Sequence, residues 1–396
     1  MSASAIAPAP TVARGLAVIL FTVFLDLLGF GMIIPILPLH ARELHATVPQ
    51  VGWLLSIYSI MQLVCAPLLG RLSDRVGRRP VLLLSIFGSA ASQLGYALSP
   101  SFPWLLLSRA LAGACGANVS AAQAYVADVT DAQSRAGAMG LLGAALGLGF
   151  VLGPFLGGEL ARVEPRLPFF VASALSGLNW VLALLLLREP VRHEKRMQGS
   201  LSREALLRLL STPPLAGLLG LFLLVTFGFA NMEGVFALFC HARFGMDRQH
   251  VGRLFALVGV VMALVQGMLV RKLAPRLGER RLVVAGIALM AGGLCTTALS
   301  YQVPSLVVGT VLIAAGSGLH TPSLSSLISQ AAGEQRGSVL GVSHALGALG
   351  RILGPLVGTW TFQLGPAVPY LTATGCMVLS LLVALYHVRQ SEPHLT

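Results

Sequence analysis

Long apolar runs alternate with short polar segments along the whole chain. Each run is close to the roughly 20 residues that a helix needs to cross a bilayer core about 30 Å thick. The pattern predicts twelve membrane-spanning helices, over residues 15–38, 50–70, 79–99, 103–127, 137–158, 168–187, 214–239, 251–270, 281–300, 304–329, 337–360 and 367–387. The first run contains Asp26 and is longer than the apolar core of a cleavable signal peptide, so we expect an uncleaved span.

The composition agrees with this pattern. Of the 396 residues, 55% are hydrophobic and only 11% are charged, whereas a soluble domain carries about 25% charged residues. These values exclude a soluble enzyme, a disordered chain and a disulfide scaffold. The formal charge of +12 does not indicate a nucleic-acid partner, because the basic residues lie in short clusters between apolar runs. The five cysteines form no CxxC pair, so we expect neither a metal nor a cofactor.

The positions of Lys and Arg predict the orientation. With both termini in the cytoplasm, the cytoplasmic segments hold 19 basic residues and the opposite side holds six. Because cytoplasmic loops are enriched in Lys and Arg, we expect both termini to be cytoplasmic. The short length of the chain and its lack of targeting tails favour a bacterial inner membrane, and a monomer is the expected state.

A repeat divides the chain into two halves. Three separate pairs of segments match at an offset of 201 residues; one pair is Gly153-Pro154 and Gly354-Pro355. Such a repeat predicts an all-α membrane protein with two pseudo-symmetric six-helix bundles and a substrate site between them at mid-membrane. The expected organisation is a cytoplasmic tail, a bundle, a cytoplasmic linker, a second bundle and a second tail, over residues 1–14, 15–188, 189–212, 213–388 and 389–396.

Several motifs name a family. The segment from Gly70 to Pro80, GRLSDRVGRRP, resembles the loop signature of the major facilitator superfamily. Arg109 with two glycines in span 4, and the GLGFVLGPFLGG segment in span 5, resemble further motifs of that superfamily, the latter associated with antiporters. Asp26-x-x-Gly29 in span 1 is similar to the tetracycline-resistance type of drug:proton antiporters. Pro275 stands where the first half has Asp74, and span 9 has no carboxylate, which argues against a magnesium–tetracycline substrate.

The resemblance implies two mechanical elements. The loop would be a cytoplasmic gate, in which Asp74 pairs with arginines and with a helix N-terminus; its residues are Gly70, Asp74, Arg75, Gly77, Arg78 and Arg79. The alternative is that these charges only set the topology. The span 5 motif would bend its helix at Gly153, Pro154 and Gly157, and a purely structural kink is the alternative.

Ionisable groups at membrane depth are costly, by about 2.5–3.5 kcal/mol on insertion scales, and therefore mark candidate sites. We expect Asp26 and Glu233 to bind and release protons, or Glu233 to recognise a cationic substrate. The alternatives are a carboxylate satisfied by a neighbouring donor for Asp26 and a position at the membrane edge for Glu233. Arg109 begins a polar stripe on span 4 and is expected to pair with Asp26, unless it reaches the outer interface instead.

We expect the substrate cavity to be lined by other polar side chains within the spans. Those expected are Gln62, Asn118, Gln123, Asn231, His320, His344 and Arg351. For the stripe that contains His344 and Arg351, helix packing through its glycines is the favoured alternative.

These observations predict a proton-coupled exporter of amphipathic organic compounds that works by alternating access. The chain carries no ATP-binding loop and no hydrolase motif, so we expect no enzymatic activity and an ion gradient as the energy source. The expected partners are a small organic substrate, protons and the lipid bilayer. A symporter or uniporter of a small solute, or a lipid-moving or sensing protein of the same fold, remain the alternatives.

Overall fold

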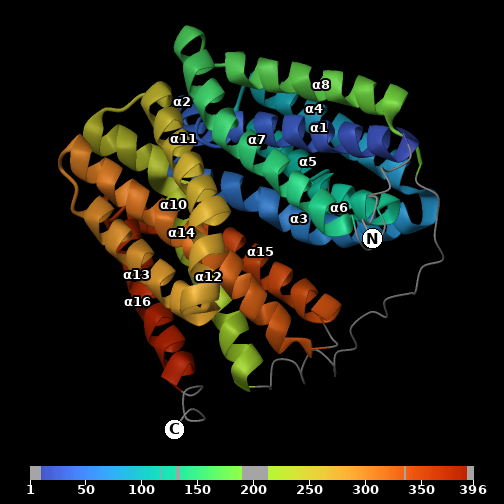
Figure 1. Ribbon diagram of the computed structural model, residues 1–396. Coiled ribbons are helices and arrows are strands. Elements are labelled where there is room, and N and C mark those ends of the chain that lie inside the picture. The colour runs from blue at the N-terminus through green and yellow to red at the C-terminus, as the bar shows by residue number, and fades with distance from the viewer. Residues whose placement is uncertain (1–9, 117, 131–133, 190–212, 334–335, 390–396) are drawn as a thin grey trace. The chain divides into compact units, whose positions relative to one another are not determined.

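The computed structural model describes residues 10–116, 118–130, 134–189, 213–333 and 336–389 (Figure 1). Within these ranges the chain is helical and contains no strand. The helices are α1 Pro10–Ile33, α2 Leu37–Glu43, α3 Val48–Val76, α4 Arg78–Ala97, α5 Phe102–Ala114, α6 Asn118–Val129, α7 Arg135–Val163, α8 Leu167–Leu186, α10 Pro213–Phe244, α11 Arg248–Leu264, the π-helical η1 Val265–Val270, α12 Arg271–Leu277, α13 Glu279–Ala298, α14 Val303–Ala331, α15 Arg336–Phe362 and α16 Val368–Arg389.

Eleven of the described helical segments are long and apolar enough to cross a membrane. They correspond to eleven of the twelve predicted spans. The remaining predicted span, residues 103–127, is divided into α5 and α6, which are each too short to be counted as a span. The interruption follows Gly113 and includes Gly116, and glycine weakens a helix because its backbone is the most flexible.

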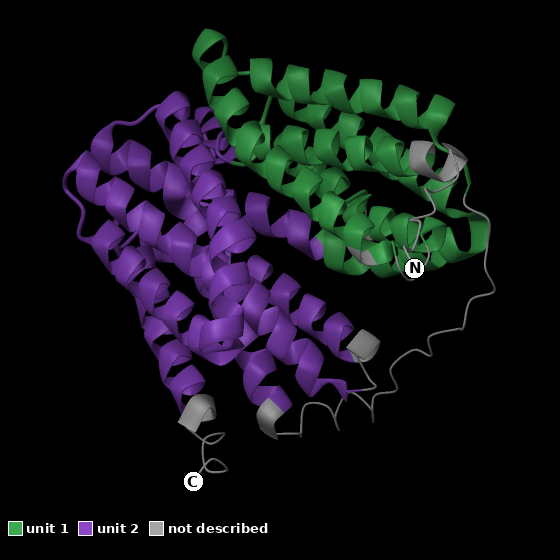
Figure 2. Ribbon diagram, in the orientation of Figure 1, with its two compact units in different colours: residues 1–34, 61–197 green, residues 35–60, 198–396 purple. Residues whose placement is uncertain are grey.

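The chain forms two compact units, which Figure 2 shows in green and purple. Unit 1 comprises residues 1–34 and 61–197, and unit 2 comprises residues 35–60 and 198–396. The division falls within α3, so the first part of that helix belongs to unit 2 and the remainder to unit 1. The expected linker core, residues 190–212, and most of both expected tails lie outside the described residues.

In unit 1, α1 packs against α7, α8 and α6. The contact with α7 is a backbone-to-backbone approach through glycines. A Cβ atom added to Gly153 would lie 2.7 Å from the carbonyl oxygen of Leu28, and one added to Gly157 would clash with the carbonyl oxygen of Met32. Small residues allow such close helix packing in a membrane, where van der Waals contact drives association.

Unit 2 repeats this packing between α10 and α15. A Cβ atom added to Gly354 would lie 2.7 Å from the backbone nitrogen of Asn231, and one added to Gly358 would lie 2.6 Å from the carbonyl oxygen of Asn231. Gly354 and Gly358 are the repeat partners of Gly153 and Gly157. The sequence repeat therefore corresponds to the same helix-packing device used twice.

Candidate functional site

Asp26 lies in the middle of α1 and is held by side chains from two other helices. The Nδ2 group of Asn118, at the start of α6, donates a hydrogen bond of 2.9 Å to Asp26 Oδ1. The same nitrogen lies 3.3 Å from Ser89 Oγ on α4, and Ser89 also hydrogen-bonds Asp26. Asn118 is only 3% exposed, so its amide serves this buried cluster. A carboxylate inside a membrane bundle thus has two fixed polar neighbours.

Arg109 is buried on α5, with 4% of its surface exposed. Its guanidinium lies 5.6 Å from the centre of the Phe30 ring on α1, which is a cation–π distance. It also interacts electrostatically with the hydroxyl of Tyr96 on α4. These contacts place Arg109 one turn along α1 from Asp26, in the same interior and away from the interface expected by the alternative interpretation.

Gln62 lies beside the interruption between α5 and α6. Its Nε2 group donates a hydrogen bond of 2.8 Å to the carbonyl oxygen of Gly116. A neighbouring helix thereby satisfies a carbonyl group that the helix break releases, as is required at membrane depth. Gln123, further along α6, has an exposed side chain.

In unit 2, Glu233 on α10 and Arg351 on α15 form an oppositely charged pair. Arg351 interacts electrostatically with Glu233 and with Tyr58 on α3. Glu233 and Tyr58 are half-buried, while Arg351 is exposed to the protein surface. The pair therefore combines one carboxylate and one guanidinium, neither of which is fully buried.

The other residues expected in this half differ in accessibility. His344 is exposed on α15, whereas His320 on α14 is 5% exposed and Asn231 on α10 is completely buried. Asn231 lies against Gly354 and Gly358, and its Nδ2 group is 3.5 Å from Thr372 Oγ1. His320 packs against Gly286 of α13. Both side chains thus lie at helix–helix contacts.

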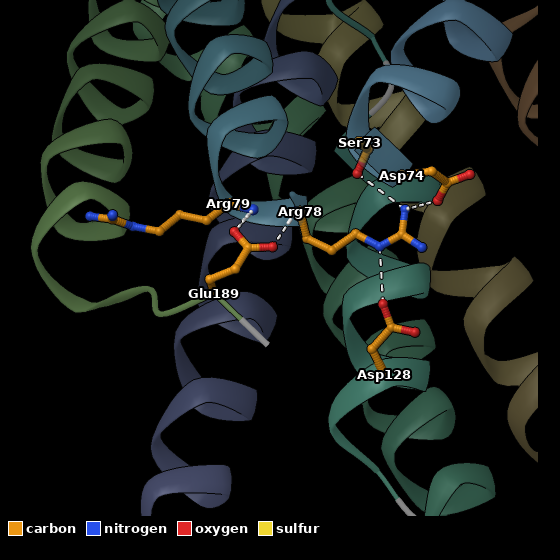
Figure 3. A network of polar contacts seen from close by, with 6 residues as sticks. All are labelled: Ser73, Asp74, Arg78, Arg79, Asp128 and Glu189. Atoms are coloured by element: carbon orange, nitrogen blue, oxygen red, sulfur yellow. Dashed lines mark hydrogen bonds and ion pairs between the residues drawn. The ribbon is translucent and has the colours of Figure 1, made fainter. Parts of the chain in front are cut away.

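The segment expected as a gating loop is almost wholly helical, because α3 extends to Val76 and α4 begins at Arg78. Polar contacts tie this junction to α6 and to the chain after α8 (Figure 3). Arg78 Nη1 lies 3.0 Å from Asp74 Oδ1 and 3.1 Å from Ser73 Oγ, while Arg78 Nε lies 3.0 Å from Asp128 Oδ2 on α6. One guanidinium therefore joins the end of α3 to the end of α6. Arg has several donors in a fixed planar arrangement, so it can satisfy these acceptors together.

Glu189 binds the first turn of α4 in the same network (Figure 3). Its Oε1 accepts a hydrogen bond of 2.5 Å from the backbone nitrogen of Arg78, and its Oε2 accepts one of 2.9 Å from that of Arg79. The first N–H groups of a helix have no partner within the helix and attract negative charge. Arg79 also donates from Nη2 to the carbonyl oxygen of Leu184 at 2.7 Å. The chain after α8 is thus attached to the start of α4.

The structure explains one glycine in this loop. Gly77 precedes α4 with φ of 124°, and a Cβ atom there would lie 2.7 Å from Glu189 Oε1. Gly77 is therefore required both by the backbone conformation and by the close approach of the carboxylate. Gly70 has open space around it, and Arg75 is exposed.

The span 5 motif lies in an uninterrupted helix. Gly153, Pro154 and Gly157 are all within α7, and Pro154 approaches Gly31 of α1. The glycines form the close contact with α1 described above.

Sequence reasoning did not identify three residues as members of these networks: Ser89, Asp128 and Glu189. Asp128 had a detectable signal, since an acid at the end of span 4 lies on the same side of the membrane as the arginine-rich loop. Glu189 lies in the LREP segment but is 111 residues from Arg78, and Ser89 carries no charge. Their partners could be found only from the packing of the helices.

Comparison with known proteins shows the family. The model of the Major Facilitator Superfamily matches residues 19–277 and 244–396. Multidrug resistance protein 1 of Bacillus subtilis (strain 168) is 30% identical over 96% of this chain and 97% of its own length. The class E tetracycline resistance protein of Escherichia coli is 36% identical over 88% of both chains.

Solved structures share the fold. The human organic anion transporter MFSD10 (TETRAN) is 28% identical, with a TM-score of 0.70 over 95% of this chain and 100% of that chain. A bacterial homologue of the human lysosomal transporter Spinster shares the fold, with a TM-score of 0.81 at 16% identity over 97% of this chain and 98% of that one. The chain with its repeated halves therefore belongs to the major facilitator superfamily and is of the drug:proton antiporter type.

Proposed function

We propose that this protein exports amphipathic organic compounds in exchange for protons and that Asp26 is the proton-binding group. The observation that carries the proposal is the contact of the Asp26 carboxylate with Asn118 and Ser89 inside unit 1. The similarity to multidrug and tetracycline resistance proteins supports the direction and the class of substrate. A proton moving down one pH unit supplies about 1.4 kcal/mol, which sustains a tenfold substrate gradient.

The cluster is suited to both protonation states of Asp26. The ionised carboxylate accepts a hydrogen bond from the Nδ2 group of Asn118. The Oδ1 atom of Asn118 is buried without a hydrogen-bond partner among the described residues. When Asp26 is protonated its O–H group needs an acceptor, and a rotation of the Asn118 amide supplies Oδ1. One amide thereby satisfies the acid before and after it binds a proton.

In this proposal Glu233 and Arg351 recognise the substrate. The two opposite charges attract each other. A cationic compound competes with Arg351 for Glu233, and binding shifts the conformational equilibrium through the difference in its affinity for the two states. Glu233 remains a second candidate for proton binding. Arg109, which is buried in the same unit as Asp26, is proposed to influence the protonation of Asp26 through its positive charge.

A second candidate is export of organic anions. The exposed guanidinium of Arg351 favours it, as does the 28% identity with the human organic anion transporter. The charge of the transported probe distinguishes the two candidates.

The remaining features of the proposal concern topology. Both termini and the linker 189–212 are cytoplasmic, in a monomer of the bacterial inner membrane, and the loop from Gly70 to Arg79 is a cytoplasmic gate. The cluster of basic residues around Arg78 supports this side of the membrane.

The test uses purified protein in proteoliposomes with an imposed pH gradient. Ethidium, tetracycline and an anionic dye serve as probes, while an internal pH indicator follows protons. We expect ethidium movement to drive opposite proton movement, and Asp26→Asn to abolish coupling while Glu233→Gln weakens ethidium binding. Glu164→Gln is the matched control, because Glu164 is exposed and caps a nearby backbone N–H group. Probe flux without proton movement, unchanged in Asp26→Asn, would refute the proposal.

A further inference from the structure

The interior of unit 1 contains several polar side chains without a hydrogen-bond partner for at least one buried atom. Among the described residues these atoms include Ser85 Oγ, Gln93 Oε1, Asn118 Oδ1, Ser176 Oγ and Asn179 Oδ1. The side chains are at most 5% exposed. Buried polar atoms are nearly always hydrogen-bonded, so such a group of them points to a polar ligand, and ordered water is the usual one.

The polar groups of α4 lie on one face. Ser85, Ser89, Ser92, Gln93 and Tyr96 are separated by four, three, one and three residues, which is the spacing of a single helical stripe. From the first to the last, the stripe extends about 16 Å along the helix. It begins near the gating loop and ends at the opposite end of α4.

Other helices bring their polar groups to this interior along α1. Asn179 Nδ2 on α8 donates to the carbonyl oxygen of Thr22 at 3.1 Å, one turn before Asp26. Gln93 and Ser176 lie beside Gly29, one turn after Asp26. A Cβ atom added to Gly29 would lie 3.1 Å from Gln93 Nε2 and 3.7 Å from Ser176 Oγ. Asn118 connects Asp26 to Ser89 between these two levels. The atoms without partners thus occur at successive levels along α1.

We propose that this interior of unit 1 binds a chain of ordered water molecules that carries protons between Asp26 and the Tyr96 end of α4. The inference rests on the proposed function, since it gives Asp26 a route by which its proton arrives. Under the topology proposed above, the Tyr96 end faces the outside, where an exporter takes up its proton. Gln93 is the central residue, because its amide lies on the stripe between Ser89 and Tyr96.

The transfer is balanced at each step. A water molecule at the Tyr96 end accepts an external proton and gives another of its protons to the next water along the stripe. The last water gives a proton to Asp26, whose carboxylate becomes a carboxylic acid, and no covalent bond other than O–H bonds changes. Arg109 faces the same end of the route from α5, near Phe30 and Tyr96. Its positive charge disfavours an excess proton there, which limits leakage while the ionised Asp26 attracts one.

The first experiment measures the rate at which Asp26 is protonated in purified protein after a rapid drop in pH. The infrared band of the carboxylic acid is followed, and its absence in Asp26→Asn assigns it. We expect Gln93→Leu to slow this protonation about tenfold or more, with ethidium binding and the final extent of protonation unchanged. The matched control is Ser380→Ala on α16, which removes a buried hydroxyl that bonds only its own helix, at Cys376.

The outcomes separate this inference from the proposed function. An assigned Asp26 band that appears equally fast in wild type, Gln93→Leu and Ser380→Ala overturns the water chain and leaves Asp26 as the proton site. A band unchanged in Asp26→Asn refutes the proton site itself.

A second measurement uses wild-type protein and so does not depend on the folding of a variant. We expect exchange into H₂¹⁸O to shift O–H bands in the infrared difference spectrum between protonated and ionised Asp26. A spectrum without bands sensitive to ¹⁸O overturns the inference.

Discussion

Glu189 caps the helix that begins at Arg78. The carboxylate comes from the chain that follows α8, and it accepts hydrogen bonds from the backbone nitrogens of Arg78 and Arg79 at 2.5 and 2.9 Å. In most helices the N-cap is the residue that immediately precedes the helix. Here that residue is Gly77, which has no side chain, and a distant carboxylate takes its place. The cap therefore satisfies the first N–H groups of α4 and also attaches the chain after α8 to that helix.

Removing this cap is expected to destabilise unit 1. Glu189→Ala leaves two N–H groups of α4 without their acceptor, and loss of a helix cap costs about 1 kcal/mol. We expect the midpoint of thermal unfolding to fall by about 2–4 °C. Glu189→Gln retains one acceptor oxygen, so its midpoint of thermal unfolding should fall by less. Glu164→Ala is the control, because that carboxylate is exposed and caps only the backbone of Arg166; an equal decrease in the control contradicts the assignment.

Gly77→Ala tests the same contact from the other side. The substitution imposes an unfavourable φ and places a methyl group against the Glu189 carboxylate, so we expect it to cost about 1–3 kcal/mol. The measurement is a double-mutant cycle by thermal unfolding with Glu189→Ala. Because the double variant removes the steric part of the penalty, its loss should be smaller than the sum of the two single losses. Strict additivity would show that the two residues do not interact.

Arg78→Lys is expected to impair transport although it conserves the charge. A single ammonium group cannot reproduce the contacts of the guanidinium with Ser73, Asp74 and Asp128. We expect a decrease in ethidium flux of about tenfold, with ethidium binding unchanged, because this network restrains the gate and the proposed binding residues belong to the other unit. Arg71→Lys, at an exposed position near the end of α3, is the control. A loss of binding in Arg78→Lys would point to misfolding in place of altered gating.

The sequence predicted the spans well because their length and apolar composition are local properties. It also predicted the repeat, and the glycines at an offset of 201 residues make equivalent contacts in the two units. The helix break after Ala114 was not predicted, because the mean hydropathy of a span-length window stays high across a short interruption. The contact partners of individual side chains were harder still to predict. The amide of Asn118 contacts Asp26, and only the packing of α6 against α1 shows this.

The pH dependence of stability should contain a contribution from Asp247, which lies outside the spans and caps α11. Partial burial acts to raise the pKa of Asp247, but hydrogen bonds from the backbone and ring of His250, at 3.0 and 2.8 Å, outweigh it and lower the pKa below its usual value. A carboxyl group with a lowered pKa in the folded state stabilises the protein above its unfolded pKa of about 3.9. That contribution is lost as the pH falls through the folded pKa.

Asp247→Ala removes this contribution, so we expect a cost of about 1 kcal/mol at neutral pH. The difference in unfolding free energy between wild type and variant should narrow as the pH falls from about 5 to about 3. Thermal unfolding across that range measures it. A difference that is constant with pH would mean that the charge of Asp247 does not contribute to the cap.

The glycines of α7 provide a test of helix packing within one helix. Gly157→Ala places a methyl group against the carbonyl oxygen of Met32, so α1 and α7 must separate, and overpacking of this kind costs about 1–3 kcal/mol. Gly147→Ala is the matched control, because a Cβ atom there meets nothing within 4 Å. Alanine favours the helix over glycine by about 1 kcal/mol, so the control should be neutral or slightly more stable. The midpoints of thermal unfolding of the two variants should therefore shift in opposite directions, or the decrease for Gly157→Ala should be clearly larger. Equal shifts would mean that α1 and α7 are not in contact at Gly157.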